Sequence, residues 1–205
     1  MRYNLSYSSG KIFLGIICAA AFGLSGCVAG QAIRLAHVSS LQQAAPVAGE
    51  NVSVEVHDDR PYVKNGIKTS DYIGHFRAGL GNTWDVSTKG NVPLAEQLKA
   101  DLQKELTAQS FTTKENSPNR RLVVDILEYN FDAYMNGRHW YELKVKSLDV
   151  NGTPLTYVVI KESHKVKGSF WFGAVGAFKR KIPKIYSQMI IDIVKRSGIT
   201  QTSEK

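Results

Sequence analysis

The sequence is poor in cysteine, with two among 205 residues, and its N-terminal apolar run, Ile12–Leu24, is short. At 13 residues the run cannot cross a hydrocarbon core of ~30 Å as a helix, which takes about 20 residues. Arg2 and Lys11 precede the run without any acid. A basic start before a short apolar core is typical of a signal peptide, which excludes a membrane span at this place.

The tetrapeptide Leu24-Ser25-Gly26-Cys27 follows the apolar run and matches the lipobox of bacterial lipoproteins at all four positions. The sequence thus resembles a secreted bacterial lipoprotein. The resemblance implies cleavage before Cys27 and a diacylglycerol with an N-acyl chain, such as palmitate, on that cysteine. By the general lipoprotein sorting pattern, Val28 implies an anchor in the outer membrane with the protein facing the periplasm. An organism with other sorting rules could place it elsewhere.

Removal of the leader changes the bulk properties of the chain. Of 205 residues and a charge of +8, 179 residues and a side-chain charge of +6 remain. Cys18 leaves with the leader and Cys27 carries lipid, so no thiol remains for a disulfide, a nucleophile or a metal site. We expect a signal peptide (1–26), an acylated N-terminus and linker (27–51), a single domain (52–200) and a disordered tail (201–205). The linker has room for a short paired segment around 32–38.

Periodic patterns predict one strand and two helices. Val52, Val54 and Val56 alternate with polar residues, which predicts a half-buried strand. Leucines recur every four residues from Leu94 to Leu106, which predicts an amphipathic helix over 92–108. A second helix is predicted over 183–197, a long polar connection over 58–90 and a short edge strand over 111–115.

Two Asn-Gly pairs, at 136–137 and 151–152, lie between runs of β-branched and aromatic residues. Asn-Gly favours a two-residue hairpin turn, so residues 122–166 are predicted to form a three-stranded antiparallel meander. If both turns are tight, the numbers of two residues that lie opposite each other sum to 273 across the first hairpin and to 303 across the second. The expected fold is a two-layer α+β domain. Its mostly antiparallel sheet, the meander plus an N-terminal strand, carries two amphipathic helices on one face.

The domain is similar to the YajG-like class of small bacterial lipoproteins. The similarity is carried by Asp58-Asp59-Arg60-Pro61, Ile73-Gly74, the leucine helix and the meander. The general architecture also resembles lipoproteins that assist envelope assembly. A likeness of fold does not transfer a function.

Catalytic signatures are missing from the sequence. There is no HExxH pattern and no GxSxG elbow, and Gly79-Leu80-Gly81 lacks the lysine of a phosphate loop. The cluster His57-Asp58-Asp59-Arg60 is expected to be structural, with Asp59 and Arg60 paired or capping the turn at Pro61. We therefore expect a non-enzymatic protein without a catalytic residue, metal or cofactor other than the lipid.

Two surfaces are candidates for a partner. On one face of the meander the predicted register gathers aromatic rings with cations, which suits an anionic lipid, a glycan or an acidic envelope protein; the alternative is cross-strand pairing for stability alone. These residues are Tyr129, Phe131, Trp140, Lys144, Lys146 and Tyr157. The second candidate resembles an interfacial membrane contact; its alternative is a strand or loop buried under the last helix. It comprises Phe170, Trp171, Phe172, Lys179, Arg180 and Lys181.

The sequence thus predicts a binding or scaffolding accessory in envelope biogenesis or in an envelope-spanning complex. The alternatives are a lipid- or lipopolysaccharide-binding transfer factor and, third, an unidentified enzyme. A transfer factor needs an apolar cavity open to solvent, which a scaffold does not. Nucleic acid is disfavoured by the compartment, and the oligomeric state does not follow from the sequence.

Overall fold

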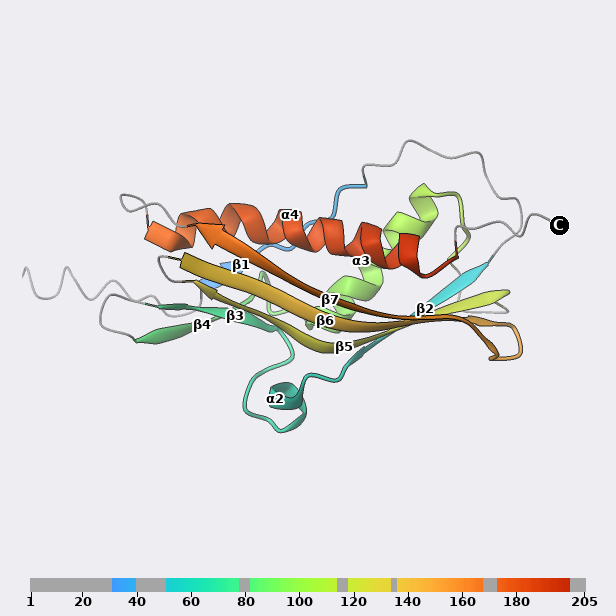
Figure 1. The fold of residues 1–205 in the computed structure, drawn as a ribbon, viewed down its shortest axis with the longest axis horizontal. Helices are drawn as coiled ribbons and strands as arrows, with labels where there is room; N and C mark the ends of the chain where they lie inside the picture. The colour runs from blue at the N-terminus through green and yellow to red at the C-terminus, as the bar shows by residue number, and fades with distance from the viewer. Residues whose placement is uncertain are drawn as a thin grey trace, which may run out of the picture.

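The computed structural model describes residues 31–39, 51–77, 82–113, 118–133, 136–167 and 173–199. Within them the chain forms one seven-stranded sheet, with two long helices on one face and a short helix on the other (Figure 1). The α+β class is as predicted. In chain order the elements are β1 (Gln31–Ile33), β2 (Val52–Asp58), α2 (Pro61–Lys64), β3 (Tyr72–Arg77), β4 (Thr83–Thr88), α3 (Leu94–Ala108), β5 (Arg120–Ala133), β6 (Asn136–Asp149), β7 (Pro154–Lys167) and α4 (Gly173–Arg196).

The sheet is mixed, so the prediction of a mostly antiparallel sheet is wrong. Its order is β1-β4-β3-β5-β6-β7, and β2 pairs with β5 off this path. The pairs β1–β4, β2–β5 and β3–β5 are parallel, whereas β3–β4, β5–β6 and β6–β7 are antiparallel. Parallel pairing needs a long crossover, and the chain between β2 and β5 supplies one that includes α3. The expected polar connection over 58–90 likewise contains α2, β3 and β4.

Away from its turn the β6–β7 hairpin has the predicted register, because Glu142 lies opposite Lys161 and Lys146 opposite Tyr157. Next to the turn a bulge between Ser147 and Leu148 shifts the register by one residue, so the turn is not the tight one predicted. The register predicted for the β5–β6 hairpin is wrong. β5 ends at Ala133 and β6 begins at Asn136, so the first Asn-Gly pair belongs to a strand and not to the turn.

A β-bulge between Ile126 and Glu128 shifts the register of β5 against β6 by one residue. Side chains alternate between faces with a period of two, so one extra residue exchanges the faces of all that follow. Tyr129 and Phe131 therefore lie on the same face as Ile126, beneath the helices, and all three are fully buried. Their assignment to a partner surface is corrected accordingly.

Helix α3 confirms the leucine pattern. It spans Leu94–Ala108, and Leu94, Leu98, Leu102 and Leu106 are all fully buried. The edge strand expected over 111–115 is reduced to one bridge between Asn51 and Thr112, and residues 114–117 lie outside the described chain.

Helix α4 is longer than predicted, since it begins at Gly173 and includes Pro183 in its interior. An interior proline removes one helix hydrogen bond and costs about 3 kcal/mol in isolation. Here Phe178 and Ile182, both N-terminal to the proline, are fully buried, and this burial offsets that cost. The alternative reading of residues 168–178 as a strand or loop is therefore wrong from Gly173 onward; residues 168–172 are not described.

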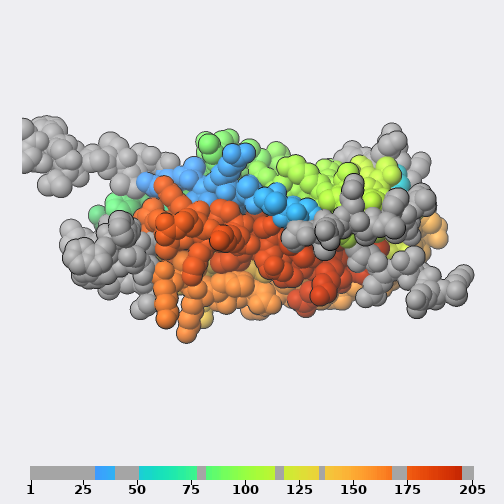
Figure 2. Space-filling model, turned by 90° about the horizontal axis from the view of Figure 1, so that it is seen from above, coloured from blue at the N-terminus to red at the C-terminus, as the bar shows by residue number. Residues whose placement is uncertain are grey.

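The segment 31–39 lies within the expected linker, at the place where a short paired segment was allowed for, and it is part of the folded body. β1 pairs with β4, and Ile33 and Leu35 are buried. Figure 2 shows this blue segment lying alongside α4.

Candidate functional site

The face of the sheet turned away from α3 and α4 is called here the open face. Buried residues of β6 such as Leu143 and Val145 point to the helices, so the residues between them point to the open face. Four of the six predicted partner-surface residues lie there, and Tyr157 is 58% exposed. The open-face residues of β6 and β7 include Trp140, Glu142, Lys144, Lys146, Tyr157, Val159 and Lys161.

A hollow of about 760 Å³ lies on the open face beside α2. Pro61 of α2, Leu127 at the bulge and Trp140 supply apolar walls. Charged side chains of both signs complete the lining: Glu128, Asp132, Arg138, Glu142, Lys161 and Glu162. The bulge turns Glu128 and Asp132 toward this face. The sequence pattern did not predict either residue here, because no local feature of the sequence indicates the bulge.

Ion pairs fix much of the charge on the open face. Lys161 contacts Glu142 at 2.7 Å. Asp125 accepts hydrogen bonds from Lys146 at 3.1 Å and from His57 at 2.9 Å. Burial acts to raise the pKa of Asp125, but these two partners outweigh it and the pKa lies below its usual range. Lys146 is therefore partly neutralised. Lys144, which lies opposite Asp125 in the register, forms no ion pair with a carboxylate among the described residues.

The buried guanidinium of Arg60 holds α2 against the sheet. It donates to both carboxylate oxygens of Asp58 at 2.7 Å and to the backbone oxygens of Tyr72 and Ser70 at 2.5 and 3.0 Å. The cluster is structural, as expected, but the predicted pairing of Asp59 with Arg60 is wrong. Arg60 pairs with Asp58, and Asp59 pairs with Lys64 at 2.7 Å. The reason is geometric, because two adjacent carboxylates point in different directions.

The Tyr62 hydroxyl extends this anchor to the hollow. It donates to Glu128 at 2.8 Å and lies 2.9 Å from the backbone oxygen of Tyr129. Burial and the nearby Glu128 raise the pKa of Tyr62, so the hydroxyl stays protonated and can donate. The walls of the hollow are therefore held in place by fixed polar contacts.

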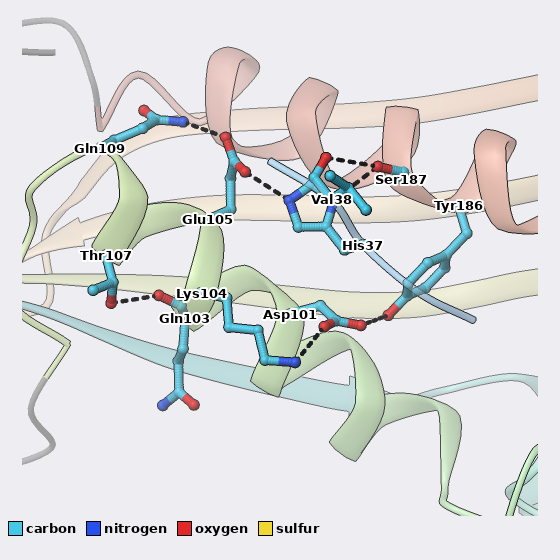
Figure 3. A network of polar contacts seen from close by, with 10 residues as sticks. All are labelled: His37, Val38, Asp101, Gln103, Lys104, Glu105, Thr107, Gln109, Tyr186 and Ser187. Atoms are coloured by element: carbon cyan, nitrogen blue, oxygen red, sulfur yellow. Dashed lines mark hydrogen bonds and ion pairs between the residues drawn. The ribbon is translucent and has the colours of Figure 1, made fainter. Parts of the chain in front are cut away.

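A polar network lies on the other side of the sheet, where segment 31–39, α3 and α4 meet (Figure 3). The His37 imidazole contacts Glu105 at 2.6 Å and Ser187 at 2.9 Å. Asp101 accepts from Tyr186 at 3.1 Å. Burial acts to raise the pKa of Glu105, but hydrogen bonds, first from His37, outweigh it and lower the pKa. This network ties the three segments together, and His37 and Asp101 also line a hollow of about 350 Å³.

A second buried polar cluster contrasts with this network. His139 is fully buried, and neither of its ring nitrogens has a hydrogen-bond partner. The Tyr129 hydroxyl and Nε2 of His164 are also buried without a hydrogen-bond partner. His139 packs edge-on against Tyr129 at 4.9 Å between ring centres and lies 6.1 Å from His164. Burial, then the nearby His164, lowers the pKa of His139 to about 3.

Among the described residues, no group of three or more His, Cys, Asp or Glu side chains is arranged to hold a metal ion. No helix in the described part of the chain is long and apolar enough to cross a membrane. Of the remaining predicted residues, Lys179, Arg180 and Lys181 are exposed on α4. Cys27 and residues 170–172 lie outside the described residues.

Comparison with known proteins supports the fold. A scan against protein-family models and a search of curated proteins both give no match. A Xanthomonas campestris protein of the DUF330 family has a similar structure, with a TM-score of 0.50 and 11% identity over 84% of this chain and 98% of that one. Two lipoproteins also match. One is an uncharacterised lipoprotein from Nitrosomonas europaea, with a TM-score of 0.41 and 9% identity over 82% of this chain and 94% of that one. The other is a minor lipoprotein from Acinetobacter baumannii, with a TM-score of 0.38 and 12% identity over 71% of this chain and 93% of that one. At these identities the likeness shows the fold alone, and the chain shares that fold with the DUF330 protein.

Proposed function

We propose that this protein is an outer-membrane-anchored lipoprotein facing the periplasm, which acts without catalysis as a binding or scaffolding accessory in envelope biogenesis or an envelope-spanning complex. The observation that carries the binding role is the asymmetry of the sheet. One face is covered by α3 and α4, whereas the open face carries a hollow of about 760 Å³ with fixed charges and an aromatic wall. The lipobox at Cys27 supports the anchor.

The open face has the chemistry of a protein-binding surface. Trp140 is half-buried in the hollow wall, and an aromatic anchor in a pocket is typical of binding hot spots. Lys144 and Arg138 add positive charge. Neither forms an ion pair with a carboxylate among the described residues, although Asp125 lies opposite Lys144 and Asp132 opposite Arg138. The partner that fits best is an envelope protein segment with an apolar side chain that contacts Trp140 in the hollow and an acidic side chain that meets Lys144 outside it.

Site-specific crosslinking tests this proposal. A photo-crosslinking amino acid replaces Lys144 on the open face or, as the matched control, exposed Gln188 on α4, in the acylated protein in its own envelope. We expect a defined crosslinked product from position 144 and none from 188. The binding role is refuted if position 144 gives no product, or if both positions give the same ones.

Charge reversal tests the same face in solution. Lys144→Glu should weaken binding of the captured partner by about tenfold, because it replaces an attractive charge on the open face by a repulsive one. Lys195→Glu, an equal charge change at the end of α4, should leave binding unchanged. Equal losses in both variants would mean that net charge, and not the open face, recruits the partner.

The transfer-factor alternative receives less support from the geometry. A lipid carrier needs an apolar cavity, whereas the hollow on the open face is lined by the carboxylates of Glu128, Asp132, Glu142 and Glu162. Extraction of radiolabelled phospholipid from vesicles by the purified protein would favour the carrier. Absence of transfer together with partner crosslinking would favour the scaffold.

A further inference from the structure

The length of chain between the lipid site and the folded body sets how near the membrane the domain must stand. Only residues 28–30 separate Cys27 from Gln31, the first residue of β1. Four residue steps span at most about 14 Å, at 3.3–3.6 Å each. The sequence reading assigned 24 residues to a linker, which as a coil would reach roughly 25 to 30 Å. The folded segment 31–39 removes that freedom.

Segment 31–39 is firmly part of the body. Ile33 is 2% exposed and Leu35 5% exposed in the main core. His37 then binds Glu105 of α3 and Ser187 of α4. Release of this segment would break the β1–β4 pairing and these contacts together, so the short tether persists in the folded protein.

The sheet topology shows which end of the domain carries the tether. Gln31 lies beside Val86, and β1 runs from there toward Thr88, parallel to β4. The opposite end of β4, at Thr83, pairs with Arg77, whose neighbour Phe76 lies beside Ala133 at the tip of β5. The chain before Gln31 therefore enters from the end of the sheet where β5 meets β6. In Figure 1, β1, the tip of β7 and the start of α4 all lie toward this end.

Cations gather at the same end. Arg138 lies opposite Lys165 near the β5–β6 tip, and Lys167 lies opposite Asn136. The first turns of α4 cover this tip, because the Phe178 ring occupies the space beside Gly137. Six exposed cations at this end of the sheet are together called the basic end: Arg138, Lys165, Lys167, Lys179, Arg180 and Lys181.

Little negative charge opposes the basic end. Within the described chain, none of its six cations pairs with a carboxylate. Asp132 is engaged by Arg77 at 2.5 Å and by His75 at 3.4 Å. Asp85 is engaged by Lys68 at 2.6 Å. Glu128 and exposed Glu162, which line the hollow together with Arg138, are the nearby acids that remain. The excess is therefore available to an external anion.

We propose that the basic end rests on the anionic headgroups of the membrane leaflet that holds the lipid anchor. The inference rests on the proposed acylation of Cys27 for the tether, whereas the charge argument stands without it. A short tether and a cationic rim at one end hold the domain with this end against the bilayer. Each cation that lies near an anionic surface raises the binding constant for that surface by roughly fivefold. The turn between β6 and β7, at the far end of the long strands, then points away from the membrane.

Vesicle flotation tests the charge without the anchor. The mature chain from residue 27 with Cys27→Ser is mixed with vesicles of phosphatidylethanolamine containing 0 or 30 mol% phosphatidylglycerol. We expect binding only with phosphatidylglycerol, and its loss at high salt. Lys179→Glu with Arg180→Glu and Lys181→Glu should reduce binding at least tenfold. The matched control reverses Lys184, Lys195 and Arg196 on the same helix and should retain binding. Equal binding by the two triple variants, or binding that ignores phosphatidylglycerol, overturns the proposal.

Energy transfer in the acylated protein tests the orientation. The mature chain has no free thiol, so Thr83→Cys near the basic end or Thr153→Cys in the distal turn gives one labelling site. With an acceptor dye on the lipid headgroups, transfer should be stronger from position 83, and the triple reversal at 179–181 should reduce that difference. Equal transfer from both positions overturns the orientation. A wild-type chain that carries no acyl group but still binds phosphatidylglycerol would refute the anchor and leave the basic end as a lipid-binding surface.

Discussion

The two ends of the long β5–β6–β7 meander differ in what they bury and what they expose. At the basic end aromatic side chains are inside: Phe178 is fully buried and its ring centre lies 5.4 Å from that of Phe131. At the distal end apolar side chains are outside, because Val150 is 71%, Leu155 53% and Tyr157 58% exposed. One end therefore offers cations over a closed core, and the other offers apolar surface. The first suits lipid headgroups, and the second extends the open face, through Tyr157, with apolar surface that a protein partner could cover.

The largest effect should come from the aromatic packing at the basic end. Phe178→Ala should destabilise the domain by about 3 to 5 kcal/mol, because it empties a fully buried site. Tyr157→Ala at the distal end should stay within about 0.5 kcal/mol. Urea unfolding of both variants measures the contrast. Similar losses would mean that the distal end is packed as tightly as the basic end.

The glycines of the two Asn-Gly pairs provide the next contrast. A Cβ at Gly137 would stand 2.2 Å from the Phe178 ring and 2.6 Å from the backbone oxygen of Asp132, so Gly137→Ala should cost about 3 kcal/mol. Gly152 needs its positive φ of 83°, and its nearest neighbour is the flexible Arg121 side chain at 3.0 Å. Gly152→Ala should therefore cost about 1 kcal/mol. Thermal unfolding midpoints rank the two variants; the reverse order would contradict the packing at residue 137.

Acid should weaken the domain through His139, which lies on β6 toward the basic end. Its pKa is about 3 in the folded state and about 6.5 in the unfolded chain. As the pH falls below 6.5, only the unfolded chain takes up the proton, so stability falls with pH. The loss should reach about 2 kcal/mol at pH 5 relative to pH 8.

The variant His139→Phe isolates this contribution. Urea unfolding at pH 5 and pH 8 should show a smaller pH dependence in the variant than in the wild-type protein, by about 2 kcal/mol. The ring neighbours Tyr129, Tyr141 and His164 are the same in both proteins. An identical pH dependence would show that His139 is hydrated or protonated in the fold.

The smallest effect is expected at the distal end. Val150→Ser with Leu155→Ser should change the free energy of unfolding by less than about 0.5 kcal/mol, since both side chains are already in water. The same double variant should reduce partner crosslinking if the distal end belongs to the partner surface. A clear drop in the unfolding midpoint would instead assign these residues to the core.

Much of the candidate surface was predictable from the sequence, because the β6–β7 register follows from a local turn signal. That register correctly placed Trp140, Lys144, Lys146 and Tyr157 on one face. It failed for Tyr129 and Phe131 because the bulge in β5 lies seven or more residues before the turn and has no turn-like composition. Glu128 and Asp132 of the hollow were missed for the same reason.

By itself, the sequence determined the features that depend on local periodicity and turn chemistry: β2, the leucine face of α3, the α+β class and the β6–β7 register. The tertiary structure decided the parallel pairing of β2 with β5, the face of Tyr129 and Phe131, the continuation of α4 through Pro183 and the incorporation of residues 31–39 into the body. These features arise from contacts between segments far apart in the chain. There, burial and pairing outweigh the local preferences that a sequence pattern reports.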